Sequence, residues 1–155
     1  MTDTRRRFVL KLAFGPVVVA LAAAAGLLRS SRAPAAEWSK DAFSAATMED
    51  ALRILHGTHA TVPSGAIKIQ APFLVENSAA VAVAVSTSLP DVQSISILVA
   101  RNKQPLAAHV NFSGALPYFA TNIKMSFNSD VHFVVKSGDK LHSAKQLIKI
   151  AAGRG

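Results

Sequence analysis

AAVAVAVSTSLPDVQSISILVA, residues 79–100, is the stretch that decides the fold. Valine alternates with alanine in its first half, and isoleucine alternates with serine in its second half. A period of two is typical of β-strands whose two faces meet different surroundings. Leu89, Pro90 and Asp91 separate the halves, and proline followed by aspartate is typical of a turn. The stretch therefore predicts two strands joined by a short connection.

The same period continues along most of the chain. It predicts seven strands, at residues 66–70, 79–86, 92–100, 106–112, 118–127, 131–137 and 140–150. Turn-forming residues separate them, including Glu76-Asn77, Ser113-Gly114, Asn128-Ser129-Asp130 and Ser137-Gly138-Asp139. Short strands at close spacing favour an all-β fold, an immunoglobulin-like antiparallel sandwich.

Alternation also assigns faces to these strands. The predicted core side chains are Val81, Val83, Val85, Ile95, Ile97, Val99, Phe119, Ile123, Met125, Phe127, Val131, Phe133 and Val135. Opposite the valines lie Ala80, Ala82 and Ala84, a small apolar face. Two interpretations stay open: another sheet or protein packs on the alanines, or the alanines face inward and a helix covers the valines.

One short helix precedes the strands. Thr47 offers an N-cap hydroxyl with Asp50 three residues later, apolar residues follow at helical spacing to Leu55, and Gly57 ends the helix. The two histidines after it, His56 and His59, form a His-x-x-His pair. A periplasmic metal-binding protein that uses this pair, with His109 or His132 and Met125, is the alternative hypothesis for function.

Composition excludes several classes of protein. The net charge is +8, but residues 37–155 carry 11 basic and 8 acidic residues, a net charge of +3, without a dense basic run, so nucleic acid is not an expected partner. The chain contains no cysteine, which excludes disulfides, thiol catalysis and thiolate metal sites. No elbow of the Gly-x-Ser-x-Gly type, phosphate-binding loop or His-Glu-x-x-His helix is present, so a binding or carrier module is favoured over an enzyme. A hydrolase would need turn carboxylates and strand histidines to converge in the folded chain.

Residues 1–36 have the pattern of an export signal. Residues 4–11, TRRRFVLK, match a twin-arginine motif, residues 12–28 are apolar, and Ala33-Pro34-Ala35 is a small-residue cleavage region. We expect export to a bacterial periplasm with cleavage near Ala35 or Ala36. An apolar run of this length is at the short end for a membrane span, so a stable membrane anchor is not expected.

The chain resembles the SoxY family, the sulfur-carrier subunit of the Sox thiosulfate-oxidising system. The resemblance lies in the twin-arginine signal, the helix at 47–55, the segments Ile67-Lys68-Ile69-Gln70-Ala71-Pro72 and Val75-Glu76-Asn77, and the turn Asn102-Lys103-Gln104-Pro105. It spans roughly residues 48–155. It implies a sandwich at residues 37–150, a heterodimer with a SoxZ-like subunit, other Sox enzymes as further partners, and no cofactor.

The resemblance also implies a flexible arm after the last strand, at Ala151, Ala152, Gly153, Arg154 and Gly155. The family carries sulfur on a cysteine in a Gly-Gly-Cys-Gly-Gly arm, and the corresponding position here is Gly153 or Arg154, neither of which is a nucleophile. Three explanations stay open: a degenerate paralogue that still pairs with a SoxZ-like subunit, a variant or error in the tail sequence, and reuse of the fold for another binding task. The first is favoured, with the Arg154 guanidinium pairing with an oxyanion or an acidic cleft.

Overall fold

The computed structural model describes residues 39–151. The predicted export signal therefore lies outside the described residues, as do Ala152, Gly153, Arg154 and Gly155 of the predicted arm. The elements are α2 (Lys40–Ser44), α3 (Met48–His56), β1 (Thr61–Pro63), β2 (Ile67–Gln70), β3 (Leu74–Val75), β4 (Val81–Thr87), β5 (Val92–Val99), β6 (Leu106–Asn111), β7 (Tyr118–Ile123), β8 (Ser129–Ser137) and β9 (Lys140–Ile150). No helix among residues 39–151 is long and apolar enough to cross a membrane.

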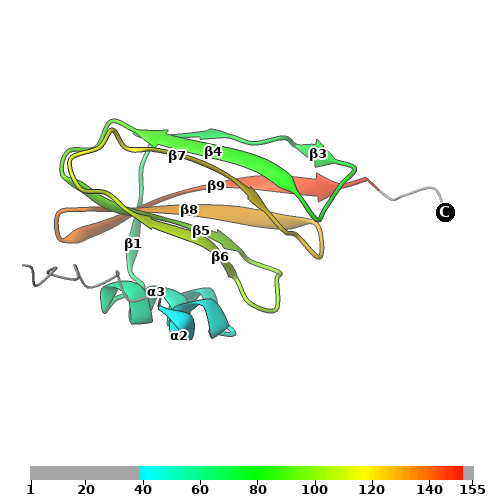
Figure 1. The fold of residues 1–155 in the computed structure, drawn as a ribbon, viewed down its shortest axis with the longest axis horizontal. Coiled ribbons are helices and arrows are strands. Elements are labelled where there is room, and N and C mark those ends of the chain that lie inside the picture. Colours follow the sequence, from blue (N-terminus) through cyan, green and yellow to red (C-terminus); the bar gives the residue numbers. More distant parts are fainter. Residues whose placement is uncertain (1–38, 152–155) are drawn as a thin grey trace, which may run out of the picture. The chain divides into compact units, whose positions relative to one another are not determined.

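The strands form two sheets that face each other, as an immunoglobulin-like sandwich requires (Figure 1). The larger sheet has the order β1-β9-β8-β5-β6, with β3 also paired to β9, and the smaller sheet has the order β2-β4-β7. The seven predicted strands are all present, and the pairs among them are antiparallel. The predicted all-β sandwich is therefore confirmed.

Two short strands and one short helix were not predicted. β1 and β3 both pair with β9, and both pairs are parallel, so the sandwich is not antiparallel throughout. With three and two residues, these strands are too short to show a period in the sequence. α2 spans five residues and is also below the length at which helical spacing becomes recognisable.

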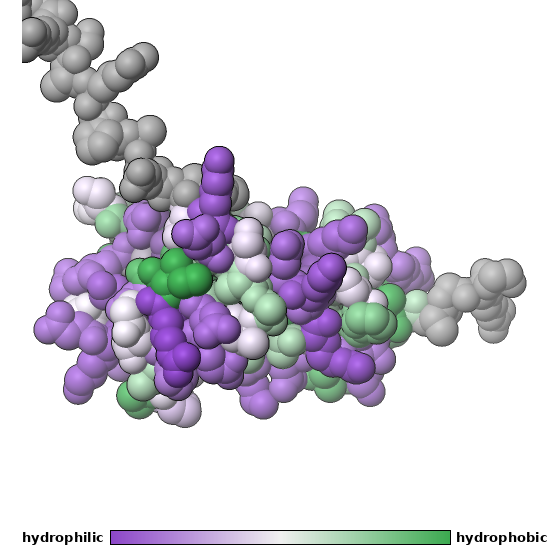
Figure 2. Space-filling model, turned by 90° about the horizontal axis from the view of Figure 1, so that it is seen from below, coloured by the Kyte–Doolittle hydropathy of each residue, from purple (hydrophilic) through white to green (hydrophobic). Residues whose placement is uncertain are grey.

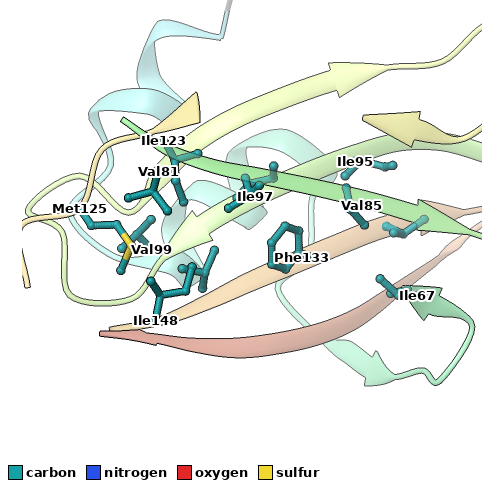
Figure 3. Close-up of a cluster of buried hydrophobic side chains, with 13 residues drawn as sticks. Ile67, Val81, Val85, Ile95, Ile97, Val99, Ile123, Met125, Phe133 and Ile148 are labelled. Carbon is teal, nitrogen blue, oxygen red and sulfur yellow. The ribbon is translucent and has the colours of Figure 1, made fainter. Parts of the chain in front are cut away.

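The core between the sheets consists of the side chains that strand alternation places there. The valines of β4, the isoleucines of β5 and residues Val131, Phe133 and Val135 of β8 are at most 3% exposed. Figure 3 shows the Phe133 ring in the middle of this cluster. Because the valines face the larger sheet, the interpretation in which a helix covers them is wrong. Of the alanines opposite them, Ala82 is exposed and Ala84 is 9% exposed.

One predicted core residue is outside the core. Phe127 is 56% exposed, although alternation from Phe119 places it inside. β7 ends at Ile123, and the Met125 backbone N–H bonds to the carbonyl of Ser78 at 2.8 Å, so the chain has left the strand before Phe127. The alternation therefore no longer decides which way this side chain points.

The helices cover the outer face of the larger sheet. Thr47 caps α3 as predicted, since its Oγ1 accepts a hydrogen bond from the Asp50 backbone N–H at 3.1 Å, and Gly57 ends the helix with φ of 74°. Ala42, Ala51 and Leu52 of the helices pack in a second buried cluster, against Leu98, Leu106, Val134 and Leu141 of the sheet. The larger sheet is therefore buried on both faces over the part that lies under the helices.

Removing the Phe133 ring tests the position of the core. We expect Phe133→Ala to lower the free energy of unfolding by about 3–5 kcal/mol, because a large cavity is left between the two sheets. Urea denaturation followed by circular dichroism measures the change. Leu116→Ala, at a side chain that is 88% exposed, is the control and should stay close to the wild type. Equal stability of the two variants would contradict this placement of the core.

Candidate functional site

The end of β9 is the first candidate site, because the predicted arm continues from it. Hydrogen bonds hold this end from two sides. The Lys149 backbone N–H bonds to the Phe73 carbonyl at 2.7 Å, and the Ala151 N–H bonds to the Val75 carbonyl at 2.8 Å. On the other side the Ile150 N–H bonds to the Asn128 side-chain oxygen at 2.8 Å. Ala151, the first residue of the predicted arm, is thus still attached to β3.

The surface around this end combines aromatic and cationic side chains. The ammonium of Lys149 lies 5.1 Å from the centre of the Phe73 ring, and the guanidinium of Arg101 lies 5.5 Å from the centre of the Phe127 ring. Both rings are more than half exposed. Contacts of this kind at exposed positions stabilise the folded chain by about 0.5–1 kcal/mol each. Sequence reasoning missed these four residues because each pair joins segments that are distant along the chain.

The histidines form a second candidate site. The structure places His56 beside His109 on β6, with ring centres 5.8 Å apart. Both rings face Ser96 of β5, whose hydroxyl is 2.9 Å from His109 Nδ1 and 3.5 Å from His56 Nε2. The Ser96 side chain is fully buried, so a packed interface between α3 and the larger sheet surrounds these groups.

Burial changes the acidity of this pair. Desolvation, followed by the charges of His109 and Lys136, lowers the pKa of His56 from 6.5 to about 4. Burial likewise lowers the pKa of His109. Both imidazoles are therefore neutral in the folded chain at neutral pH.

The other residues of the metal-binding hypothesis, His59, His132 and Met125, lie outside this pair. Arg53 donates a hydrogen bond to Nδ1 of His59 at 3.2 Å, and His59 and His132 both line a hollow of about 160 Å³ beside α3. Burial is the main cause that lowers the pKa of His132. Met125 is 1% exposed and belongs to the core. Among residues 39–151 no three or more His, Cys, Asp or Glu side chains are grouped so that they could hold a metal ion. The structure thus brings His56 together with His109, and the His-x-x-His site stays a hypothesis.

Together, the fold and the candidate sites describe an immunoglobulin-like sandwich in which helices cover the larger sheet and the last strand is paired with β3 at its end. A domain of this kind belongs to the class of binding or carrier domains. The family described as "Sulfur oxidation protein SoxY" matches residues 53–154. A solved structure, the sulfur carrier protein SoxY from Chlorobium limicola f thiosulfatophilum, is 34% identical, with a TM-score of 0.62. The similarity covers 72% of this chain and 98% of that one. No match is found among curated protein sequences.

The chain belongs to the SoxY family. The family resemblance inferred from the sequence is confirmed, together with the fold that it implied. The family consists of sulfur oxidation proteins, and the solved relative is a sulfur carrier protein.

The buried histidines predict a dependence of stability on pH. The unfolded chain binds a proton at His56 once the pH falls below 6.5, whereas the folded chain does so only near pH 4. The free energy of unfolding should therefore fall as the pH drops from 6.5 to 4, and His109 and His132 act in the same direction. Below pH 4 His56 should cause no further loss.

His56→Gln removes this contribution and should flatten the decline, as measured by urea denaturation at a series of pH values. His59→Gln, which removes an exposed histidine three residues away, is the matched control. The interpretation fails if His56→Gln shows the same decline as the wild type.

Proposed function

We propose that this chain is a periplasmic SoxY-family subunit that pairs with a SoxZ-like partner and acts in thiosulfate oxidation without carrying sulfur covalently. The observation that carries the proposal is the combination of a complete SoxY sandwich with a sequence that contains no cysteine. A covalent sulfur adduct needs a nucleophilic thiolate, and no residue of this chain supplies one. What the chain retains is the domain that binds partners.

The twin-arginine motif and the apolar run after it support export to the periplasm. The role would then be that of a degenerate paralogue, which binds the SoxZ-like subunit or regulates it. The carrier position corresponds to Gly153 or Arg154, and the Arg154 guanidinium is suited to binding oxyanions or carboxylates.

The outer face of the smaller sheet supports pairing with another β-protein. Ala82, Ala84 and Ala120 lie next to one another across β4 and β7, and Gln70 and Asn122 flank them. Side chains this small allow the backbone of a partner to approach closely. No described helix covers this face, whereas α2 and α3 cover the outer face of the larger sheet.

Binding to the SoxZ-like subunit of the same cell tests the proposal. The mature chain and a version that stops after Ala151 should both bind, because the truncation keeps the hydrogen bond that attaches β9 to β3. A pull-down with the purified subunit measures this. Failure of both forms to bind would contradict the heterodimer and leave the chain as an unassigned member of the family.

A substitution on the alanine face locates the partner. We expect Ala82→Arg to weaken binding of the SoxZ-like subunit by at least about tenfold, because a long charged side chain prevents close approach. Lys140→Glu, at the exposed first residue of β9, is the control that changes charge away from this face. Unchanged binding of Ala82→Arg would place the partner on another surface.

A further inference from the structure

Two histidines from distant segments of the chain direct ring nitrogens toward one buried oxygen. His109 Nδ1 lies 2.9 Å from the Ser96 hydroxyl, and His56 Nε2 lies 3.5 Å from the same oxygen. The second contact is at the outer limit of a hydrogen bond, so this nitrogen is weakly held. Two nitrogens and one oxygen therefore converge between α3 and the larger sheet.

The register of the larger sheet brings these donors together. Ser96 and His109 are direct partners in the pairing of β5 with β6, and Ser94 pairs with Asn111 in the next row of the same face. The Asn111 side chain hydrogen-bonds to the His109 ring. A second polar contact of this kind usually orients a histidine that binds a metal. His56, the last residue of α3, supplies the other ring.

The spacing of the two rings suits a shared metal ion. Imidazole nitrogens bind such an ion at about 2.0–2.1 Å, which separates the two ring centres by roughly 5–6 Å. The observed separation is 5.8 Å. Both imidazoles are neutral at neutral pH, the form in which histidine coordinates a metal. The pair therefore has the position and the protonation state of a two-histidine site.

The surroundings contain one electrostatic feature that favours a cation and one that opposes it. The site lies at the C-terminal end of α3, where the helix dipole favours positive charge. Lys136 acts in the opposite direction, since its charge lowers the pKa of His56. Both rings are only half-buried, and Figure 2 shows a largely hydrophilic surface on the side of the molecule where the helices lie. A hydrated ion can therefore reach the pair from solvent.

The available donors select the class of metal. Imidazole suits copper, zinc and nickel, whereas magnesium, calcium and manganese prefer oxygen donors. The chain has no cysteine, and among residues 39–151 no group of three or more His, Cys, Asp or Glu side chains forms a fuller site. For nitrogen and oxygen donors, copper(II) has the highest affinity among the divalent first-row ions. Positions that the protein does not fill stay open to water.

We propose that His56 and His109 form a binding site for copper(II), with the Ser96 hydroxyl as a third donor, and that the bound ion links the end of α3 to β6. The site differs from the His-x-x-His pair, because the ring of His59 accepts a hydrogen bond from Arg53 and is not part of it. It does not rest on the proposed function, since all three donors belong to this chain.

Equilibrium dialysis of the purified mature chain against copper(II) sulfate near neutral pH, without a histidine tag, tests the proposal. We expect about one ion per chain and an electron paramagnetic resonance spectrum with nitrogen coupling, because the strong donors are imidazoles. His56→Gln and His109→Gln should each weaken copper binding at least about tenfold, since the loss of even an outer partner of a metal site has this effect.

Two further variants give results that a purely structural role of the histidines would not produce. Lys136→Gln should strengthen copper binding at least about twofold, because it removes a positive charge near the ion. His59→Gln, which removes an exposed histidine three residues from His56, should bind copper as the wild type does. Circular dichroism verifies that every variant is folded.

Hydrogen exchange followed by mass spectrometry tests the link between α3 and β6. Copper should slow the exchange of the α3 amides in the wild type and leave it unchanged in His109→Gln, because the ion opposes local opening of the helix only when both rings hold it. Equal exchange of the wild type with and without copper would contradict the link.

Three results of the dialysis would overturn the proposed site. The first is a wild type that takes up no copper, and the second is copper binding that stays unchanged in His56→Gln and His109→Gln. The third is a His59→Gln variant that loses copper as completely as His56→Gln does, which would make the His-x-x-His pair the site.

Discussion

The pairing of β9 along both of its edges is the constraint on which the rest of the structure depends. β8 pairs with it from Lys140 to Ile148, and the short strands β1 and β3 pair with parts of its other edge. If the backbone N–H and C=O groups of β9 were unpaired, this last strand would be free to move. Because β3 and the Asn128 side chain hold the end of the strand, Ala151 has a fixed place.

The seven main strands could be predicted because each is long enough for its alternation to be seen, and the cap at Thr47 because its chemistry is local. Features that depend on contacts between segments far apart in the sequence could not be predicted. β1 and β3 are strands only because β9 lies beside them, and Phe127 is exposed only because β7 ends early. The pairing of His56 with His109 has the same origin: it requires α3 to pack on β5 and β6, which no pattern within either segment reveals.

The described residues keep the architecture of the solved sulfur carrier, although the sequence contains no cysteine. The core is formed by Val, Ile and Phe side chains of the strands, and the residues that correspond to the carrier position in the family lie beyond the last strand. The core of the sandwich therefore does not depend on a cysteine.

β2 and β7 form the two edges of the smaller sheet, and the properties of these edges affect self-association of the protein. Unpaired strand edges are templates on which further strands can assemble into fibrils. Here β2 has only four residues and an exposed lysine at Lys68, while β7 is preceded by Pro117 and followed by the exposed Lys124. Short length, proline and lysine all oppose the addition of a strand. These features protect the monomer from aggregation while leaving the alanine face between the two edges open.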